Sequence, residues 1–154
     1  MKRNATLLIA TLILAGAGLS FAGDSATDGV VTDNRELVEM PAETQAMMRA
    51  EMRDHLMALS SIMGYLADND LATAAEVAEE RLGRSSMGKH KGTRRGMGPG
   101  KYMPKEMKKI GHGMHDAASR FATVAASGDL NGSYVALHDV VAACAACHTS
   151  FRIR

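Results

Sequence analysis

The sequence predicts an all-α protein that folds as an antiparallel four-helix bundle. Aromatic residues make up only 4% of the 154 residues and Trp is absent, whereas Met and Ala are abundant. This composition suits helices that pack through Leu, Met and Ala better than it suits β-sheets. Apolar residues also recur at steps of three and four in several stretches, which are separated by segments rich in Gly, Asn and Ser. The length and the apolar content are sufficient for one hydrophobic core.

The N-terminus has the features of a secretory signal peptide. Lys2 and Arg3 precede an apolar run over residues 7–19, and the small residues Ser20 and Ala22 follow it. The run is shorter than the roughly 20 residues that span a bilayer, so we expect cleavage after Ala22 and no stable membrane insertion. Export predicts a periplasmic location, where the environment is oxidising and an unused thiol would be a liability.

The charge of the exported chain is nearly balanced. Removal of residues 1–22 takes away two of the 18 basic residues and none of the 17 acidic ones, which leaves a net charge of about −1. A nucleic-acid partner would require a basic surplus, so none is expected. The sequence also lacks a phosphate-binding loop after a strand and a recognisable catalytic triad, so we expect no enzyme.

The exported chain begins with a leader and continues into the helical domain. Residues 23–38 are polar and rich in Gly, Asp and Thr, which predicts a flexible leader. The four-helix domain follows over residues 39–154, and its first helix begins near Pro41 and ends near Ala67. The apolar stripe predicted along this helix consists of Met48, Met52, Leu56, Leu59, Met63 and Leu66.

The second helix is short and is followed by a long connection. Asp70 can cap a helix over residues 71–82, and Gly83 can end it. Residues 83–103 are glycine-rich and basic and show no apolar period, so they predict a long loop.

Two further helices complete the predicted bundle. Pro104 opens the third helix, and Asn131 or Ser133 can cap the fourth, which we expect to continue to the end of the chain. The apolar residues predicted for the third helix are Met107, Ile110, Met114, Phe121 and Val124. Those predicted for the inward face of the fourth are Leu137, Val141, Cys144 and His148.

The fourth helix contains both cysteines of the chain, in the stretch CAACHTSFR. Cys144 and Cys147 are i and i+3 neighbours and His148 is i+4 from Cys144, so the three side chains leave the helix from one side. C-x-x-C-H is the attachment signature of c-type haem, in which two thiols form thioether bonds and the adjacent imidazole ligates the iron. The sequence therefore predicts one covalently bound haem c.

Two other chemistries are open to this cysteine pair. A redox-active or disulfide-bonded C-x-x-C pair is expected on a strand-to-helix turn, and no strand pattern precedes the motif here. A structural zinc site would need further ligands, and the chain has no second cysteine pair. Covalent haem fits the pattern better than either.

An exported four-helix chain with CAACH on its last helix and an Arg four residues after the His resembles the cytochrome c-prime family and its low-spin relatives. The layout is similar over most of the exported chain, but the specific likeness lies in CAACHTSFR. The resemblance implies that Cys144, Cys147 and His148 hold the haem and that Arg152 packs near its edge. It also implies electron transfer with a periplasmic redox partner protein, and assembly as a homodimer.

In this family the sixth ligand position of the iron faces the first helix. A Met there suits electron transfer, whereas an apolar side chain leaves the iron open to a small gas such as NO or CO. Comparison of the helix end LADND with that of the family brings Met52 near the ligating position of the low-spin members. Met48 and His55 remain candidates, and so does a site with no protein ligand, because Met often only fills a core.

A different hypothesis is copper binding. The mixture of thioether and imidazole groups that copper prefers is concentrated within residues 87–115. The residues concerned are Met87, His90, Met97, Met103, Met107, His112, Met114 and His115. Their spacing repeats no ligand pattern, and the nearby Lys and Arg residues would repel a copper cation. The same basic residues would instead suit docking of an acidic redox partner.

Overall fold

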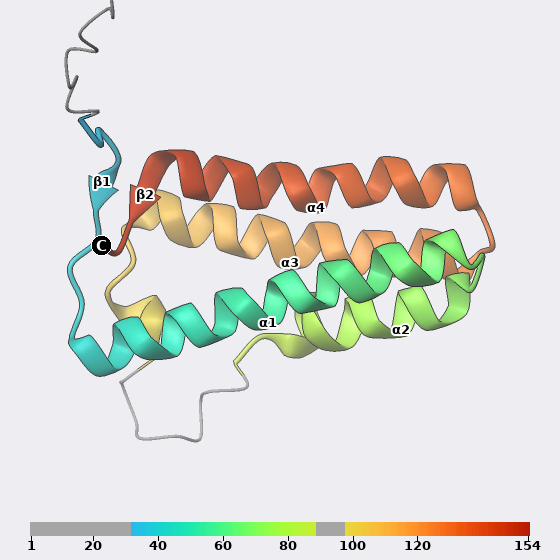
Figure 1. Cartoon of the computed structure of the whole chain (residues 1–154), viewed down its shortest axis with the longest axis horizontal. Coiled ribbons are helices and arrows are strands. Elements are labelled where there is room, and N and C mark those ends of the chain that lie inside the picture. The colour runs from blue at the N-terminus through green and yellow to red at the C-terminus, as the bar shows by residue number, and fades with distance from the viewer. Residues whose placement is uncertain (1–31, 89–97) are drawn as a thin grey trace, which may run out of the picture. The chain divides into compact units, whose positions relative to one another are not determined.

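Four helices account for most of the computed structural model, which describes residues 32–88 and 98–154 (Figure 1). The α-helices are α1 (Ala42–Ala67), α2 (Leu71–Arg81), α3 (Lys105–Ala126) and α4 (Leu130–Ser150). Two short 3-10 helices, η1 (Arg84–Ser86) and η2 (Pro99–Lys101), and two short strands, β1 (Glu36–Leu37) and β2 (Phe151–Arg152), complete the described elements. The predicted all-α class and the four-helix arrangement are confirmed.

Some predicted features lie outside the described residues. These are the signal peptide over residues 1–22, the first part of the leader, and the middle of the long loop, with His90 and Met97. From Asp33 to Arg154 the described residues belong to one compact unit. Within the described ranges, no helix is both long enough and apolar enough to cross a membrane.

Successive helices run in opposite directions, and each packs on the next (Figure 1). α1 packs against α2, α2 against α3 and α3 against α4, whereas α1 and α4 barely contact each other. One end of the bundle holds the turns that join α1 to α2 and α3 to α4 (Figure 1). The opposite end, which we call the strand end, holds β1, β2, the start of α1, the start of α3 and the end of α4 (Figure 1).

Aspartate side chains cap two of the helices. Asp70 caps α2 as predicted, and its carboxylate accepts a hydrogen bond of 3.1 Å from the backbone N–H three residues later. For α4 the prediction of Asn131 or Ser133 is wrong, because Asp129 caps the helix by accepting a 2.8 Å hydrogen bond from the N–H of Gly132. The helix therefore starts earlier than predicted, and the hydroxyl of Ser133 donates back to the carbonyl oxygen of Asp129.

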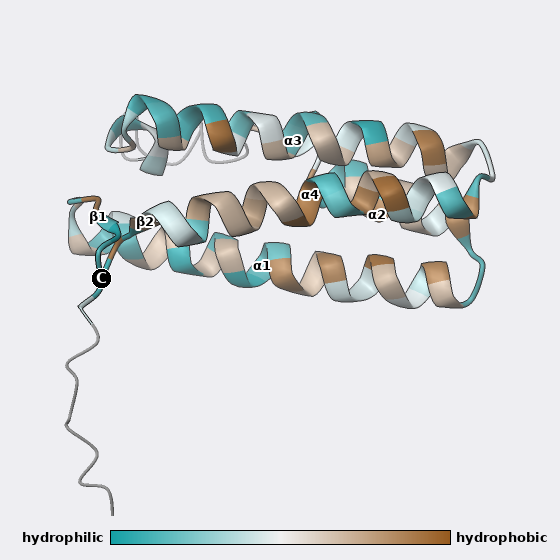
Figure 2. Cartoon of the chain, turned by 90° about the horizontal axis from the view of Figure 1, so that it is seen from above, coloured by the Kyte–Doolittle hydropathy of each residue, from teal (hydrophilic) through white to brown (hydrophobic). Residues whose placement is uncertain are grey.

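Two apolar clusters make up the described core. The larger one draws on all four helices and is rich in Ala, which lets the helices approach closely; its largest fully buried side chain is Phe121. Apolar residues are correspondingly frequent along the packed helices in Figure 2. The smaller cluster lies at the strand end and consists of Val38, Met40, Met48, Met107 and Phe151.

The buried face of α1 is rotated slightly from the predicted stripe. Four predicted members are buried or half-buried, namely Met48, Met52, Leu59 and Leu66. Leu56 and Met63 are instead 67% and 55% exposed, and His55 and Ile62 lie in the interior in their place. Both sets repeat at steps of three and four, so the period alone does not distinguish them, and a polar His ring is not expected in an apolar core.

The fourth helix and the leader also differ from the prediction. Val141 and His148 are exposed, and Val140 is buried in the core instead of Val141. α4 does not continue to the end of the chain but stops at Ser150, where Phe151–Arg152 becomes a strand. This strand pairs in parallel with Glu36–Leu37, so the second half of the predicted flexible leader is ordered by its partner.

Phe121→Ala is expected to lower the free energy of unfolding by about 3–5 kcal/mol, because it removes a fully buried ring and leaves a cavity. Val135→Ala, at a site that is 70% exposed on α4, should change it by less than about 0.5 kcal/mol. Urea unfolding followed by circular dichroism measures both. Equal losses in the two variants would contradict the assigned core.

Candidate functional site

A cavity at the strand end of the bundle brings most of the predicted site residues together. Its volume is about 370 Å³, which falls within the roughly 300–1,000 Å³ that is usual for ligand pockets. Cys147, His148 and Arg152 line it from the C-terminal side, and Met48 and Met52 line it from α1. The other lining residues are Arg35, Arg49, Arg53, Met107, Phe151, Ile153 and Arg154.

The antiparallel course of the helices explains this convergence. The N-terminal half of α1 and the C-terminal end of α4 lie at the same end of the bundle, although they are about 100 residues apart in the sequence (Figure 1). α1 packs against α2, and α4 packs against α3, whereas the backbones of α1 and α4 come close at few points. Side chains on the facing flanks of α1 and α4 can therefore line a ligand site.

The two cysteines have different surroundings. Cys147 lines the cavity and packs against the smaller apolar cluster, whereas Cys144, one turn earlier, packs against the larger one. Both are free thiols and half-buried. Burial raises the pKa of each thiol above its usual 9.0, and the neighbouring Cys144 raises that of Cys147 further. The structure therefore contains two protonated, unbridged thiols on consecutive turns of one helix.

The cavity wall is strongly basic. It carries five arginines, which are Arg35, Arg49, Arg53, Arg152 and Arg154. The Nε–H group of Arg152 is buried and donates no hydrogen bond within the described part of the chain. Its ion-pair partner Asp33 lies 3.6 Å away, which is too far for a hydrogen bond. A ligand that brings carboxylate oxygens to this wall of arginines would be stabilised by charge-assisted hydrogen bonds.

These residues fit haem c. Two thiols and an imidazole lie within one helical turn, which is the arrangement that thioether attachment and axial ligation require. Thioether sulfurs of Met48 and Met52 line the same cavity from the other helix, and guanidinium groups are available for the two haem carboxylates.

His55, the weaker candidate for the sixth ligand, does not line this cavity. Its side chain is only 8% exposed, and its ring packs edge-on against that of His115 on α3, with 6.2 Å between the ring centroids. Nδ1 of His115 donates a 2.7 Å hydrogen bond to the carbonyl oxygen of Leu82. The structure therefore favours Met52 over His55, because one turn of the helix directs the two side chains into different environments.

The Met and His residues considered for copper are distributed over different surroundings where the structure describes them. Met107 and Met114 belong to different core clusters, and His115 is hydrogen-bonded to a backbone carbonyl. Over the described ranges, no group of three or more His, Cys, Asp or Glu side chains is arranged to hold a metal ion. His90, Met97 and the basic residues between them lie outside those ranges.

An ionic cluster that the sequence pattern does not reveal lies beside the cavity. The guanidinium group of Arg35 donates hydrogen bonds of 2.9 and 2.7 Å to the two carboxylate oxygens of Asp33. Its remaining nitrogen donates a 3.2 Å hydrogen bond to the backbone carbonyl of His148. The D-x-R spacing within the polar leader was the only available signal, and nothing in the sequence connects it to a residue 113 positions later.

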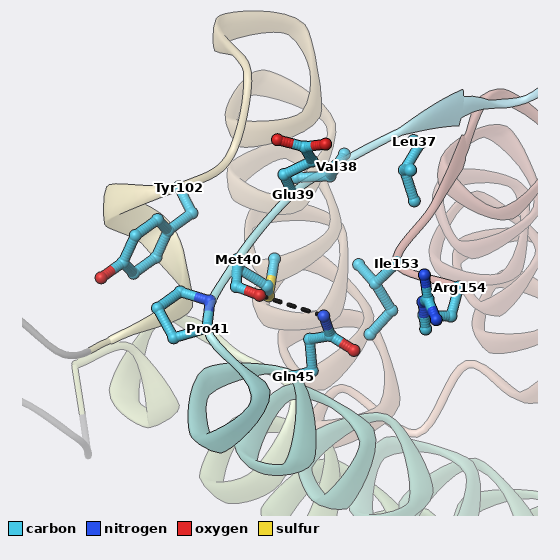
Figure 3. A pocket seen from close by; sticks show the side chains of 9 residues that line it. All are labelled: Leu37, Val38, Glu39, Met40, Pro41, Gln45, Tyr102, Ile153 and Arg154. Carbon is cyan, nitrogen blue, oxygen red and sulfur yellow. Dashed lines mark hydrogen bonds between the residues drawn. The ribbon is translucent and has the colours of Figure 1, made fainter.

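A second hollow of about 470 Å³ lies beside the cavity and shares Ile153 and Arg154 with it. Figure 3 shows these two side chains on one wall and Tyr102 on the opposite one, with Gln45 donating a 3.0 Å hydrogen bond to the carbonyl of Met40. None of the predicted haem residues lines this hollow. The first cavity is the candidate functional site because it is lined by Cys147, His148 and Met52.

The pKa of Asp33 is expected to be about 2 instead of 3.8, chiefly because Arg35 donates hydrogen bonds to its carboxylate. Since this pKa lies below that of the unfolded chain, the contact stabilises the fold above about pH 4, and its contribution is lost as the pH falls through about 2. NMR titration of the Asp33 carboxyl carbon measures the value, and Arg35→Gln should return it toward 3.8. A wild-type midpoint near 3.8 would contradict the described ion pair.

The comparison with known families bears on the part of the chain that contains the cysteine motif. The model of the family described as Cytochrome C' matches residues 102–152, which include α3, α4 and the whole of CAACH. No curated protein and no solved structure matches the chain significantly. The resemblance predicted from the sequence is thereby confirmed over residues 102–152, about a third of the chain.

Proposed function

We propose that this protein is a periplasmic mono-haem cytochrome of the c-prime type that transfers electrons. The observation that carries this proposal is the single cavity lined by Cys147 and His148 from α4 and by Met52 from α1. The imidazole and the thioether would supply ligands to a haem iron in this space, and the thiol would supply one of the two covalent attachments.

Each residue around the cavity has a defined task in this proposal. Cys144 and Cys147 would hold haem through thioether bonds to its two vinyl groups, and His148 would ligate its iron from α4. Arg152 lines the cavity wall, and its guanidinium group, whose Nε faces Asp33 at 3.6 Å, would pair with a haem carboxylate there. When bound, haem c supplies reversible one-electron chemistry, while the chain fixes its position and limits access of water.

Met52 is our candidate for the sixth ligand. Its side chain is half-buried and lines the cavity. Met48 also lines the cavity, but it is a buried member of the smaller apolar cluster, whereas Met52 packs at the margin of that cluster. A Met ligand raises the haem potential, which suits electron transfer.

The remaining parts of the proposal rest on the sequence. The signal-like N-terminus supports a periplasmic location, and an electron carrier requires a redox partner protein there. Pairing of two copies is proposed on the family resemblance alone. Gas binding is the alternative function: if Met52 does not ligate the iron, the side of the site opposite His148 is open to a ligand such as NO or CO.

The double variant Cys144→Ala/Cys147→Ala is expected to lose covalently bound haem completely, because no other thiol is present in the chain. The protein should be produced in a host with the c-type haem attachment machinery, and haem staining after denaturing electrophoresis measures attachment. A haem-stained band of unchanged intensity in the double variant would refute the assigned attachment site.

The reduced wild-type protein is expected to show sharp α and β absorption bands that do not change under CO, since Met52 fills the sixth position. Met52→Ala should open that position, so that its reduced spectrum shifts with CO and its midpoint potential falls. Met48→Ala is the matched control, because it removes the same side chain one turn away, and it should stay insensitive to CO. A wild-type spectrum that shifts under CO would contradict the Met52 ligand and favour gas binding.

A further inference from the structure

The segment before α1 is tied to the end of α4 that carries the site residues. We call residues 33–40 the latch. Parallel pairing of β1 with β2 brings the latch alongside residues 151–152, and the N–H of Val38 donates a 2.8 Å hydrogen bond to the carbonyl of Arg152. Val38 and Met40 are buried and pack in one cluster with Phe151. The latch is therefore anchored by both backbone pairing and apolar burial.

The charged part of the latch faces the cavity. Arg35 is held by Asp33 through both carboxylate oxygens, and it donates to the backbone carbonyl of His148 at 3.2 Å. Nε of Arg152 lies 3.6 Å from the carboxylate of the same Asp33. One carboxylate thus faces two of the arginines that line the cavity.

The hydrogen bond from Arg35 satisfies the backbone carbonyl of His148 at the C-terminal end of α4. The last four carbonyl groups of a helix have no helical N–H partner. The carbonyl of His148 would need the N–H of Arg152, but Arg152 belongs to β2 and not to the helix. Arg35 supplies the missing donor, and its positive charge is favourable at a helix C-terminus.

We propose that Asp33 and Arg35 are positioning residues for the haem site. Arg35 fixes the backbone of His148, and with it the last turn of α4 that carries Cys147. Asp33 orients Arg35 and holds Arg152 at the cavity wall. This inference rests on the proposed function. The C-x-x-C-H motif supplies His148 but does not fix its orientation, and we assign that role to the latch.

The test compares Arg35→Gln and Asp33→Asn with a matched control, Glu36→Gln, which removes a charge from the neighbouring strand position without altering the contacts above. Arg35→Lys keeps the charge and one donor and serves as the rescue variant. Hydrogen–deuterium exchange of the haem-free and haem-loaded chains measures the order of the α4 end. The midpoint potential and the electron paramagnetic resonance signal of the loaded protein measure the orientation of the axial His.

We expect exchange at the last turn of α4 and at residues 151–153 to be about tenfold faster in Arg35→Gln and Asp33→Asn than in the control. The loaded variants should also show a shifted potential and a broadened resonance signal, and Arg35→Lys should recover part of both. Faster exchange with an unchanged potential and signal would overturn the positioning role, since it would leave the latch only a stabilising element.

The two proposals fail in distinguishable ways. If the wild-type chain carries no covalent haem, the proposed function fails, while exchange in the haem-free chain still decides whether Arg35 holds the end of α4. The latch inference would be overturned if Arg35→Gln and Asp33→Asn both exchanged at the same rate as the control Glu36→Gln. This holds even if the wild-type protein carries haem.

Discussion

The site depends on how α1 and α4 are supported. Both pack through small and apolar residues against α2 and α3, and they barely contact each other. Arg81 of α2 also pairs with Asp54 of α1 at 2.5 Å, which adds an ionic contact between these two helices. Since the backbones of α1 and α4 are in close contact at few points, their facing flanks at the strand end leave room for ligand-binding side chains. This is the arrangement that a flat cofactor between the first and last helices requires.

The second constraint is electrostatic. Five arginines line one cavity, and of these Arg35 and Arg152 are the two that face the single carboxylate of Asp33. Like charges gathered on a partly buried surface are unfavourable unless counter-charges approach them. A ligand with two carboxylate groups would relieve this repulsion, so the charge of the wall and the thiol–imidazole chemistry of α4 point to the same cofactor.

Local sequence signals predicted the fold well and part of the site. The three- and four-residue periods located the helices, Asp70 was identifiable as a cap, and C-x-x-C-H was decisive because two thiols and an imidazole at that spacing have few uses. The rotation of α1 was not predictable, since Leu56 and Ile62 fit equally regular stripes and differ only in which neighbour covers them. The pairing of Glu36 with Phe151 depends on tertiary packing across the whole chain, which no local pattern reports.

The most direct test of the central claim is the intact mass of the denatured protein after production with the c-type haem attachment machinery. The account predicts the mass of the mature chain plus one haem, with no thiol left to react with an alkylating reagent. A chain of unmodified mass with two reactive thiols would contradict it, because the cavity at the strand end would then hold no covalent cofactor.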